Sequence, residues 1–251
     1  MRAPRLLDEM YRVAWGDLCY FKDHAPTILL SCLVGPLLYL VAFGYGLGNG
    51  MSEGVDNYLA FIIPGIIAMA TLSATFSFIS SKMLIQKLFY SSLDELMLCP
   101  IKTSSIVLGK SVIGIIRGML SCTIILIVGS FISGEISISP ILFVIIFIST
   151  MTFSLLGILA GLLARKHNEL TVFTSLVIVP MTFLSGTIFK ISDVPDAIGA
   201  IIYAMPLTHP TETIRATMLG TEFPWISMVV MIVYCVAFFV LNYYIIRCHK
   251  Y

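Results

Sequence analysis

Long runs of apolar residues, separated by short stretches that carry the charges, dominate the sequence. A helix that crosses about 30 Å of hydrocarbon needs about 20 apolar residues, because lipid cannot satisfy exposed backbone groups. The charge-free runs cover residues 24–52, 57–81, 118–134, 136–164, 170–189 and 223–246. All but the third are long enough, and the third becomes so when it extends N-terminally across Lys110 and Arg117. The pattern therefore predicts six spanning helices, near residues 27–47, 58–79, 106–131, 141–163, 170–189 and 225–246.

A further charge-free run, 197–211, lies between the fifth and sixth predicted spans and is cut by Pro206 and Pro210. It is compatible with an interfacial loop, with a helical hairpin that re-enters the membrane, or with a seventh span. We expect an all-α membrane protein in which residues 1–251 form one transmembrane domain.

The segment before the first span has the pattern of a helix that lies in the membrane interface. Its charged residues, among them Asp17, fall outside one apolar helical face. That face repeats at spacings of three and four residues, and it would place Trp15 at the depth of the lipid headgroups. The apolar face comprises Leu6, Leu7, Met10, Tyr11, Ala14, Trp15, Leu18 and Phe21.

Composition agrees with a membrane protein. Hydrophobic residues make up 58% of the chain and charged residues only 12%, and the mean hydropathy is +0.98. A soluble domain carries about 25% charged residues, so the composition excludes a cytosolic globular protein and a disordered chain. The net charge of +1 gives no reason to expect nucleic acid as a partner.

The distribution of Lys and Arg predicts the orientation of the spans. With six spans, the segments on the side of both termini contain eleven Lys and Arg. The segments on the other side contain two, both within 190–224. Basic residues remain on the cytoplasmic side. We therefore expect a multi-pass protein of the plasma membrane with both termini in the cytoplasm.

Two short motifs suggest enzymes, and both are incomplete. Gly109-Lys110-Ser111 resembles the end of a phosphate-binding loop, but Ser104 stands where that motif needs a glycine. Ser185-Gly186 resembles the serine motif of intramembrane proteases, but Phe183 replaces its first glycine. The Cys and His residues show no metal-ligand spacing and are expected to be structural: Cys19, Cys32, Cys99, Cys122, Cys235, Cys248, His24, His167, His209 and His249. We expect neither an enzyme nor a metal site.

Lys110 and Arg117 are the charged residues of the third predicted span. A charge inside a span is a functional candidate, but long side chains near a helix end can also reach the headgroups. Both interpretations stay open for the two residues. The pairs Gly114/Gly118 and Gly157/Gly161 have the small-xxx-small spacing of closely packed membrane helices, without identifying their partners.

Two segments between spans are longer and more organised than simple connections. Residues 82–100 predict an amphipathic helix with an acidic pair, Asp94 and Glu95, that ends before Pro100. Such a length suggests a docking surface. On the opposite side, residues 184–220 contain Leu-Ser-Gly-Thr-Ile-Phe and Pro-Leu-Thr-His-Pro-Thr-Glu-Thr-Ile-Arg, with Gly and Pro residues that interrupt helices.

Together these features resemble the type-2 ABC transporter permease family, the membrane subunits of bacterial and archaeal ABC exporters. The resemblance covers the whole chain. The stretch 206–220 is most similar to permeases of the nodulation-factor (lipo-oligosaccharide) exporter branch, although the daunorubicin-type drug and polysaccharide branches share much of it.

The resemblance implies a half-transporter that works as a dimer, by default a homodimer. Each copy would bind a separate ABC ATPase subunit that holds the ATP and Mg²⁺, so this chain itself would need no cofactor. The coupling helix that contacts the ATPase would include Phe89, Tyr90, Leu93, Asp94, Glu95 and Pro100. Re-entrant outer helices would close the exit with Leu184, Ser185, Gly186, Thr187, Pro206, Leu207, His209, Glu212, Arg215 and Gly220. Candidate path residues, chosen by span position alone, are Tyr39, Phe43, Met69, Phe76, Val179 and Met181.

Spans two and five are rich in Ile, Val, Met and Ser rather than aromatic residues. This favours an amphiphilic substrate such as a glycolipid or lipo-oligosaccharide over a bare polysaccharide. The alternatives are a drug-efflux permease of the same family, a channel or ion-coupled transporter that acts alone, and a membrane enzyme. The last two would need polar groups at mid-membrane that the spans lack.

Overall fold

The computed structural model describes residues 3–41, 58–89, 92–133, 139–187 and 195–248, and these ranges contain helices but no strand. Four helices are long and apolar enough to cross a membrane. They are α3 (Tyr58–Leu88), α5 (Thr103–Ser133), α6 (Pro140–Leu163) and α11 (Trp225–Cys248). They coincide with the second, third, fourth and sixth predicted spans, which are thereby confirmed.

The first and fifth predicted spans have a different form. The first corresponds to α2 (Ala25–Val41), and the remainder of 27–47 lies outside the described residues. The fifth, 170–189, is divided into α7 (His167–Phe173), a π-helical turn (Thr174–Ile178) and α8 (Val179–Leu184). Pro180 has no N–H to continue the helical ladder, which accounts for the widened turn directly before it. Spanning by these two segments stays a prediction.

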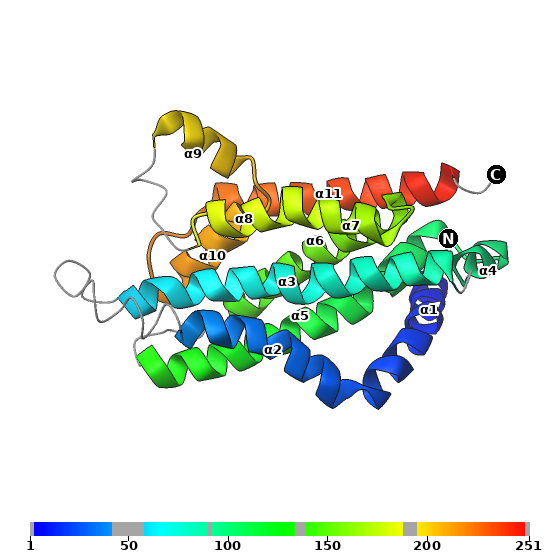
Figure 1. Cartoon of the computed structure of the whole chain (residues 1–251), viewed down its shortest axis with the longest axis horizontal. Helices are drawn as coiled ribbons and strands as arrows, with labels where there is room; N and C mark the ends of the chain where they lie inside the picture. Colours follow the sequence, from blue (N-terminus) through cyan, green and yellow to red (C-terminus); the bar gives the residue numbers. More distant parts are fainter. Residues whose placement is uncertain (1–2, 42–57, 90–91, 134–138, 188–194, 249–251) are drawn as a thin grey trace.

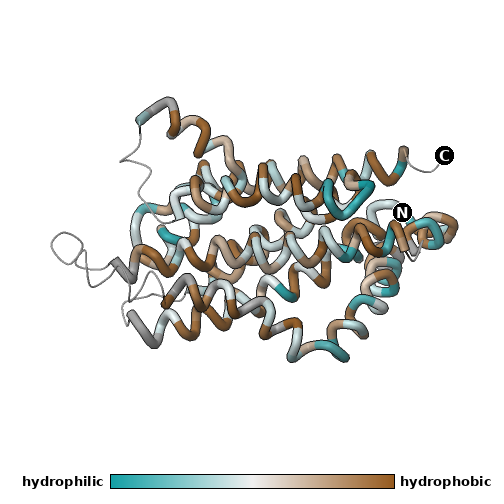
Figure 2. Tube along the Cα trace, in the orientation of Figure 1, coloured by the Kyte–Doolittle hydropathy of each residue, from teal (hydrophilic) through white to brown (hydrophobic). Residues whose placement is uncertain are grey.

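The long helices run side by side and the shorter ones lie at the two ends of the bundle (Figure 1). One end carries α1 (Ala3–Asp23), which crosses the bundle axis, and α4 (Ser92–Leu98). The last residues of α11 lie at this same end. The opposite end carries α9 (Asp196–Tyr203) and α10 (Thr208–Leu219). Apolar segments follow the long helices, and hydrophilic segments gather near α1, α4 and the start of α7 (Figure 2).

Glycines allow α3, α5 and α6 to pack closely around a common core. A Cβ atom at Gly118 of α5 would lie 2.5 Å from side-chain carbons of Thr150 and Thr75. At Gly161 of α6, a Cβ atom would lie 2.8 Å from the backbone oxygen of Ser80 in α3. Gly114 and Gly157 are enclosed in the same way. The close packing predicted from the two glycine pairs is confirmed, and α3 is the partner common to both.

Hydrogen bonds between hydroxyl groups and neighbouring helices complete this core. Ser149 of α6 donates to the Thr71 hydroxyl of α3 over 2.9 Å, and Ser154 of α6 donates to the Ser111 carbonyl of α5 over 3.0 Å. In a bilayer, close contact and such polar bonds replace the hydrophobic drive that holds soluble helices together.

Helix α1 forms where the sequence predicts an interfacial helix, but it presents a different face to the bundle. Leu7, Tyr11 and Trp15 are exposed, as an interfacial stripe should be, whereas Ala14 and Asp17 are buried. The pattern of apolar residues places Asp17 outside the apolar face but identifies no partner for it. The structure places lysines of α3 and α5 beside it.

We expect Gly161→Ala to destabilise the protein by about 2 kcal/mol, since the added methyl overpacks a core contact that involves backbone. Gly35→Ala in α2 is the matched control, because a Cβ there meets nothing within 4 Å. Thermal unfolding in detergent measures both. Equal melting temperatures for the two variants would contradict the close α3–α6 contact.

Candidate functional site

A buried cluster of charges connects α1 to the bundle. The Asp17 carboxylate of α1 lies 3.0 Å from Lys82 Nζ of α3 and 3.3 Å from Lys110 Nζ of α5. Gln86 of α3 donates a third contact over 3.3 Å. Lys110 is only 8% exposed. Its charge is paired with Asp17 inside the protein.

A second acidic residue of α1 contacts the start of α5. The Glu9 carboxylate accepts hydrogen bonds from the Ser105 hydroxyl over 2.8 Å and from the Lys102 N–H over 3.3 Å. A carboxylate at a helix N-terminus is stabilised by the unsatisfied N–H groups and the dipole there. Glu9 and Asp17 thus hold α1 against α5 at two points.

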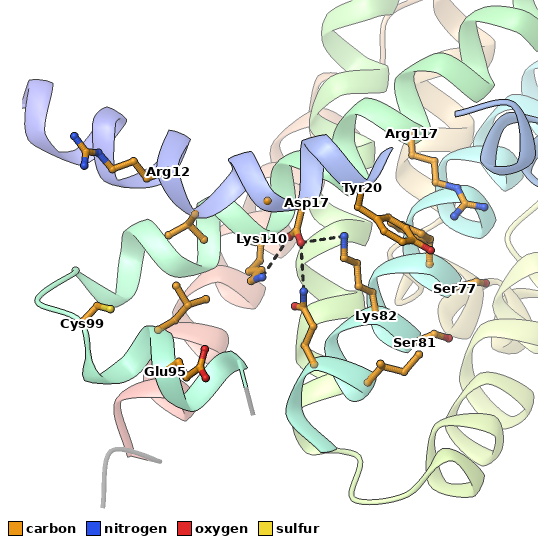
Figure 3. A pocket seen from close by; sticks show the side chains of 16 residues that line it. Arg12, Asp17, Tyr20, Ser77, Ser81, Lys82, Glu95, Cys99, Lys110 and Arg117 are labelled. Carbon is orange, nitrogen blue, oxygen red and sulfur yellow. Dashed lines mark hydrogen bonds and ion pairs between the residues drawn. The ribbon is translucent and has the colours of Figure 1, made fainter. Parts of the chain in front are cut away.

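An open cavity of about 1150 Å³ lies beside the Asp17 cluster, between α1, α3, α5 and the segment around α4 (Figure 3). Arg117 of α5 forms part of its wall, with its guanidinium carbon 4.4 Å from the centre of the Phe78 ring. Arg117 also donates to the Ser31 hydroxyl of α2 over 3.1 Å. Of the two charged residues in the third span, one is therefore in an ion cluster and the other lines a cavity.

The predicted coupling residues lie at the end of the bundle that carries α1. Segment 82–100 is not one amphipathic helix, because α3 continues to Leu88 and α4 begins at Ser92. Leu93 is buried at 4% exposure and anchors α4. Tyr90 lies outside the described residues. The other described residues of the set are exposed: Phe89, Asp94, Glu95 and Pro100.

The end of α3 next to α4 is fastened to α6. Lys87 Nζ donates to the carbonyl oxygens of Leu162 over 2.6 Å and of Ala164 over 3.2 Å. These carbonyls belong to the C-terminus of α6, where a cation is favourable. The contact couples the position of α4 to two of the four long helices.

At the other end of the bundle, Arg215 joins the two predicted outer segments. Its guanidinium donates to the carbonyl oxygens of Gly186 over 2.9 Å and Thr187 over 3.2 Å. It also lies 3.9 Å above the Phe61 ring of α3. Burial lowers the pKa of Arg215 to about 10, so the side chain remains cationic at neutral pH. A Cβ at Gly65 would overlap the Thr187 carbonyl oxygen, which leaves no room between α3 and this loop.

The remaining outer residues surround this contact or cap α10. Ser185, Leu207 and His209 are buried, whereas Leu184 is exposed and Pro206 half-buried. Desolvation lowers the pKa of His209, whose Nε2 lies 3.1 Å from the Tyr203 carbonyl oxygen. Glu212 accepts a hydrogen bond from the Ser227 hydroxyl over 2.6 Å. Gly220 ends α10 with a left-handed backbone conformation at φ 67°.

The candidate path residues do not form one described surface. Met69, Phe76 and Met181 are buried in the core of this chain, whereas Val179 is 45% exposed. The side chain of Tyr39 and the whole of Phe43 lie outside the described residues. Their assignment to a path stays a prediction.

Sequence patterns alone did not identify Glu9, Asp17 and Gln86 as members of a site. An acidic residue on a helix beside the membrane can be recognised from the sequence as needing a counter-charge. The sequence does not show which basic residue supplies that counter-charge. The contacts of Asp17 lie 69 residues away at Gln86 and 93 residues away at Lys110. No local pattern connects residues at such separations.

The chain was compared with known proteins. The family described as ABC-2 type transporter matches residues 13–219. Nodulation protein J of Neorhizobium galegae is 28% identical, with 83% of this chain and 80% of that protein covered. Nodulation protein J of Rhizobium leguminosarum bv. viciae is 30% identical, covering 80% and 78%. Inner membrane transport permease YadH of Escherichia coli (strain K12) is 24% identical, covering 95% and 96%. The matched residues include the cavity, α4 and the Arg215 contact.

Arg215→Lys should destabilise the outer segment, because an ammonium cannot reproduce the forked contact with two carbonyl groups. We expect a loss of about 2 kcal/mol, the scale of a hydrogen bond to a charged group. Arg165→Lys, at an exposed position, is the matched control. Limited proteolysis between α8 and α10 together with thermal unfolding measures the effect. Unchanged cleavage and melting in Arg215→Lys would show that the contact is dispensable.

Proposed function

The chain belongs to the ABC-2 type transporter family, and from this premise we propose that it is the permease subunit of an exporter driven by ATP hydrolysis in a separate ATPase subunit. It is a multi-pass membrane protein with a transport function. The observation that carries the finer proposal is the exposed surface of α4 and its neighbours, at the end of the bundle opposite α9 and α10.

The α4 surface has the composition of a protein-docking site. Phe89 is 77% exposed and Leu98 is 88% exposed, and they flank the exposed carboxylates of Asp94 and Glu95. Exposed apolar side chains beside charges are typical of interaction sites. Because Leu93 is buried, α4 can bind a partner while it stays anchored to the bundle. We propose that this surface binds the ABC ATPase.

A displacement of α4 would be transmitted to the membrane-spanning helices through direct contacts. Helix α4 packs against α3, and Lys87 binds the end of α6. Closure of the ATPase dimer would then favour one of two arrangements of the bundle, as a ligand with different affinity for two states does. ATP and Mg²⁺ would act in the partner, and this chain would supply the mechanical linkage.

The outer segment is proposed to close the exit. Arg215 connects α10 to Gly186 and Thr187, and Gly65 places α3 directly against Thr187. A shift of α3 would therefore change the position of this loop. In this proposal α9 and α10 are the re-entrant outer helices.

Six spans, with both termini in the cytoplasm, remain the proposed topology. Helix α2 exposes Leu30, Val34 and Leu38 at helical spacing, and α8 exposes Val179 and Phe183. Apolar faces of this kind fit lipid or a second copy of the chain. We propose a homodimer in the plasma membrane of a bacterium or archaeon, with these faces at or near the interface.

The proposed substrate is an amphiphilic glycolipid or lipo-oligosaccharide. The likeness of residues 206–220 to nodulation-factor exporters and the matches to nodulation protein J support it. The alternative is efflux of drugs, which the same motif would allow. Stimulation of the ATPase by the two classes of compound distinguishes them.

We expect Glu95→Lys to abolish ATPase binding and stimulation while the protein still inserts, because the change reverses a charge at the centre of the α4 surface. Purification of the tagged chain from its native host, followed by identification of bound subunits and an ATPase assay, measures both. Glu222→Lys changes an exposed carboxylate outside the α4 surface and should behave as wild type. Recovery of the unaltered chain without any ATPase would contradict the proposed function itself.

The topology predicts that a cysteine replacing Asp196, in a chain without its six native cysteines, reacts with an impermeant thiol reagent from outside. Asn168→Cys, in the first turn of α7, should react only after the membrane is opened. With the N-terminus in the cytoplasm, labelling of the cysteine at position 196 only from the cytoplasmic face would mean an even number of spans before it and would contradict the six-span topology.

A further inference from the structure

The cavity beside Asp17 has an excess of positive charge. Lys82 and Lys110 share the one carboxylate of Asp17, so this cluster carries one positive charge in excess. Arg12, which also lines the cavity, is neutralised by Asp8 at 3.1 Å. An excess of this kind at a water-accessible wall attracts anions.

Two of these cations converge on one end of the cavity. The Arg117 guanidinium and Lys82 Nζ lie 4.4 Å and 5.5 Å from the centre of the same Phe78 ring. Within the described part of the chain, Lys82 Nζ makes no hydrogen bond of good geometry, although Asp17 lies within ion-pair distance. Lys82 Nζ is thus a buried cation whose hydrogen-bonding capacity Asp17 does not fully use. Figure 3 shows Ser77 near this end and Glu95 at the opposite end, so the nearby hydroxyl can add a donor, and the Glu95 carboxylate lies away from it.

Helix lengths place this end of the cavity at the depth of the lipid headgroups. Helices α3 and α5 each contain 31 residues, whereas about 20 suffice to cross the hydrocarbon. Tyr58 begins α3 and Ser133 ends α5 at the end of the bundle opposite α1. With these residues at one boundary of the hydrocarbon, the other boundary falls about 20 residues along each helix, close to Phe78 in α3 and Ile113 in α5. Lys82 then lies on the headgroup side of it, and Arg117 about one helical turn inside. The exposed Tyr11 and Trp15 of α1 fit the same depth.

We propose that the Lys82–Arg117 end of this cavity binds the phosphate of an anionic membrane phospholipid. The phosphate accepts hydrogen bonds from the Arg117 guanidinium and the Lys82 ammonium, which are stronger than those between neutral groups. The acyl chains remain in the bilayer. The bound lipid would fill the space between α1 and the bundle. This site requires neither transport nor the ATPase, and it goes beyond the proposed function.

Native mass spectrometry of the full chain, released from detergent with phosphatidylglycerol or phosphatidylcholine, tests the proposal. We expect retained phosphatidylglycerol in preference to phosphatidylcholine. Arg117→Gln should weaken phosphatidylglycerol binding at least tenfold, as expected for loss of a charge-assisted contact. Arg165→Gln removes the same charge from an exposed site outside the cavity lining and should leave binding unchanged.

Ser31→Ala separates lipid binding from a structural role of Arg117, because it removes the contact with α2 but keeps the charge. It should retain phosphatidylglycerol. Equal losses in Arg117→Gln and Arg165→Gln, or no preference between the two lipids, would overturn the proposal. Inorganic phosphate that displaces phosphatidylglycerol at equal concentration would also overturn it, by showing that the cavity recognises a soluble anion.

Discussion

At Gly157 and Gly161, α6 approaches α3 so closely that a side chain at either position would meet backbone oxygen. Because no water or lipid can enter such a contact, α3 is held closely against α6. One end of α3 then presents Gly65 to the Thr187 carbonyl, and the other presents Lys82 and Lys87 to α1 and α6. The groups proposed to act at the two ends of the bundle are thus attached to the same helix.

The charged cluster at Asp17 is stable only as a set. A buried carboxylate loses its hydration and regains the energy only if cations and hydrogen-bond donors surround it. Lys82, Lys110 and Gln86 provide these groups from two helices. The cluster consequently specifies how α1 docks on the bundle, which an apolar stripe alone would leave free to rotate. The lysines that neutralise Asp17 carry more positive charge than that carboxylate can balance. The same lysines line the cavity beside the cluster.

The four long spans could be predicted from the sequence because length and hydropathy are properties of a single segment. The glycine pairs also predicted a kind of contact, although not its partner. The docking face of α1 could not be predicted, since Asp17 is explained only by residues on α3 and α5. The fifth segment was predicted as one span because it is uniformly apolar, and Pro180 alone does not reveal a π-helical turn. At the outer end, Arg215 belongs to a recognisable motif, but its carbonyl partners at Gly186 and Thr187 depend on the tertiary fold.

The position of α1 at the start of the chain has a consequence for how the protein is made. Asp17 is synthesised before Lys82 and Lys110. Helix α1 therefore stays at the membrane surface without its counter-charges until α3 and α5 have been made. Domains form as their segments emerge, and here the earliest segment can dock only after α5 has been inserted. Attachment of α1 is therefore a late step in biogenesis, and it can occur only in a chain whose third predicted span, α5, is in place.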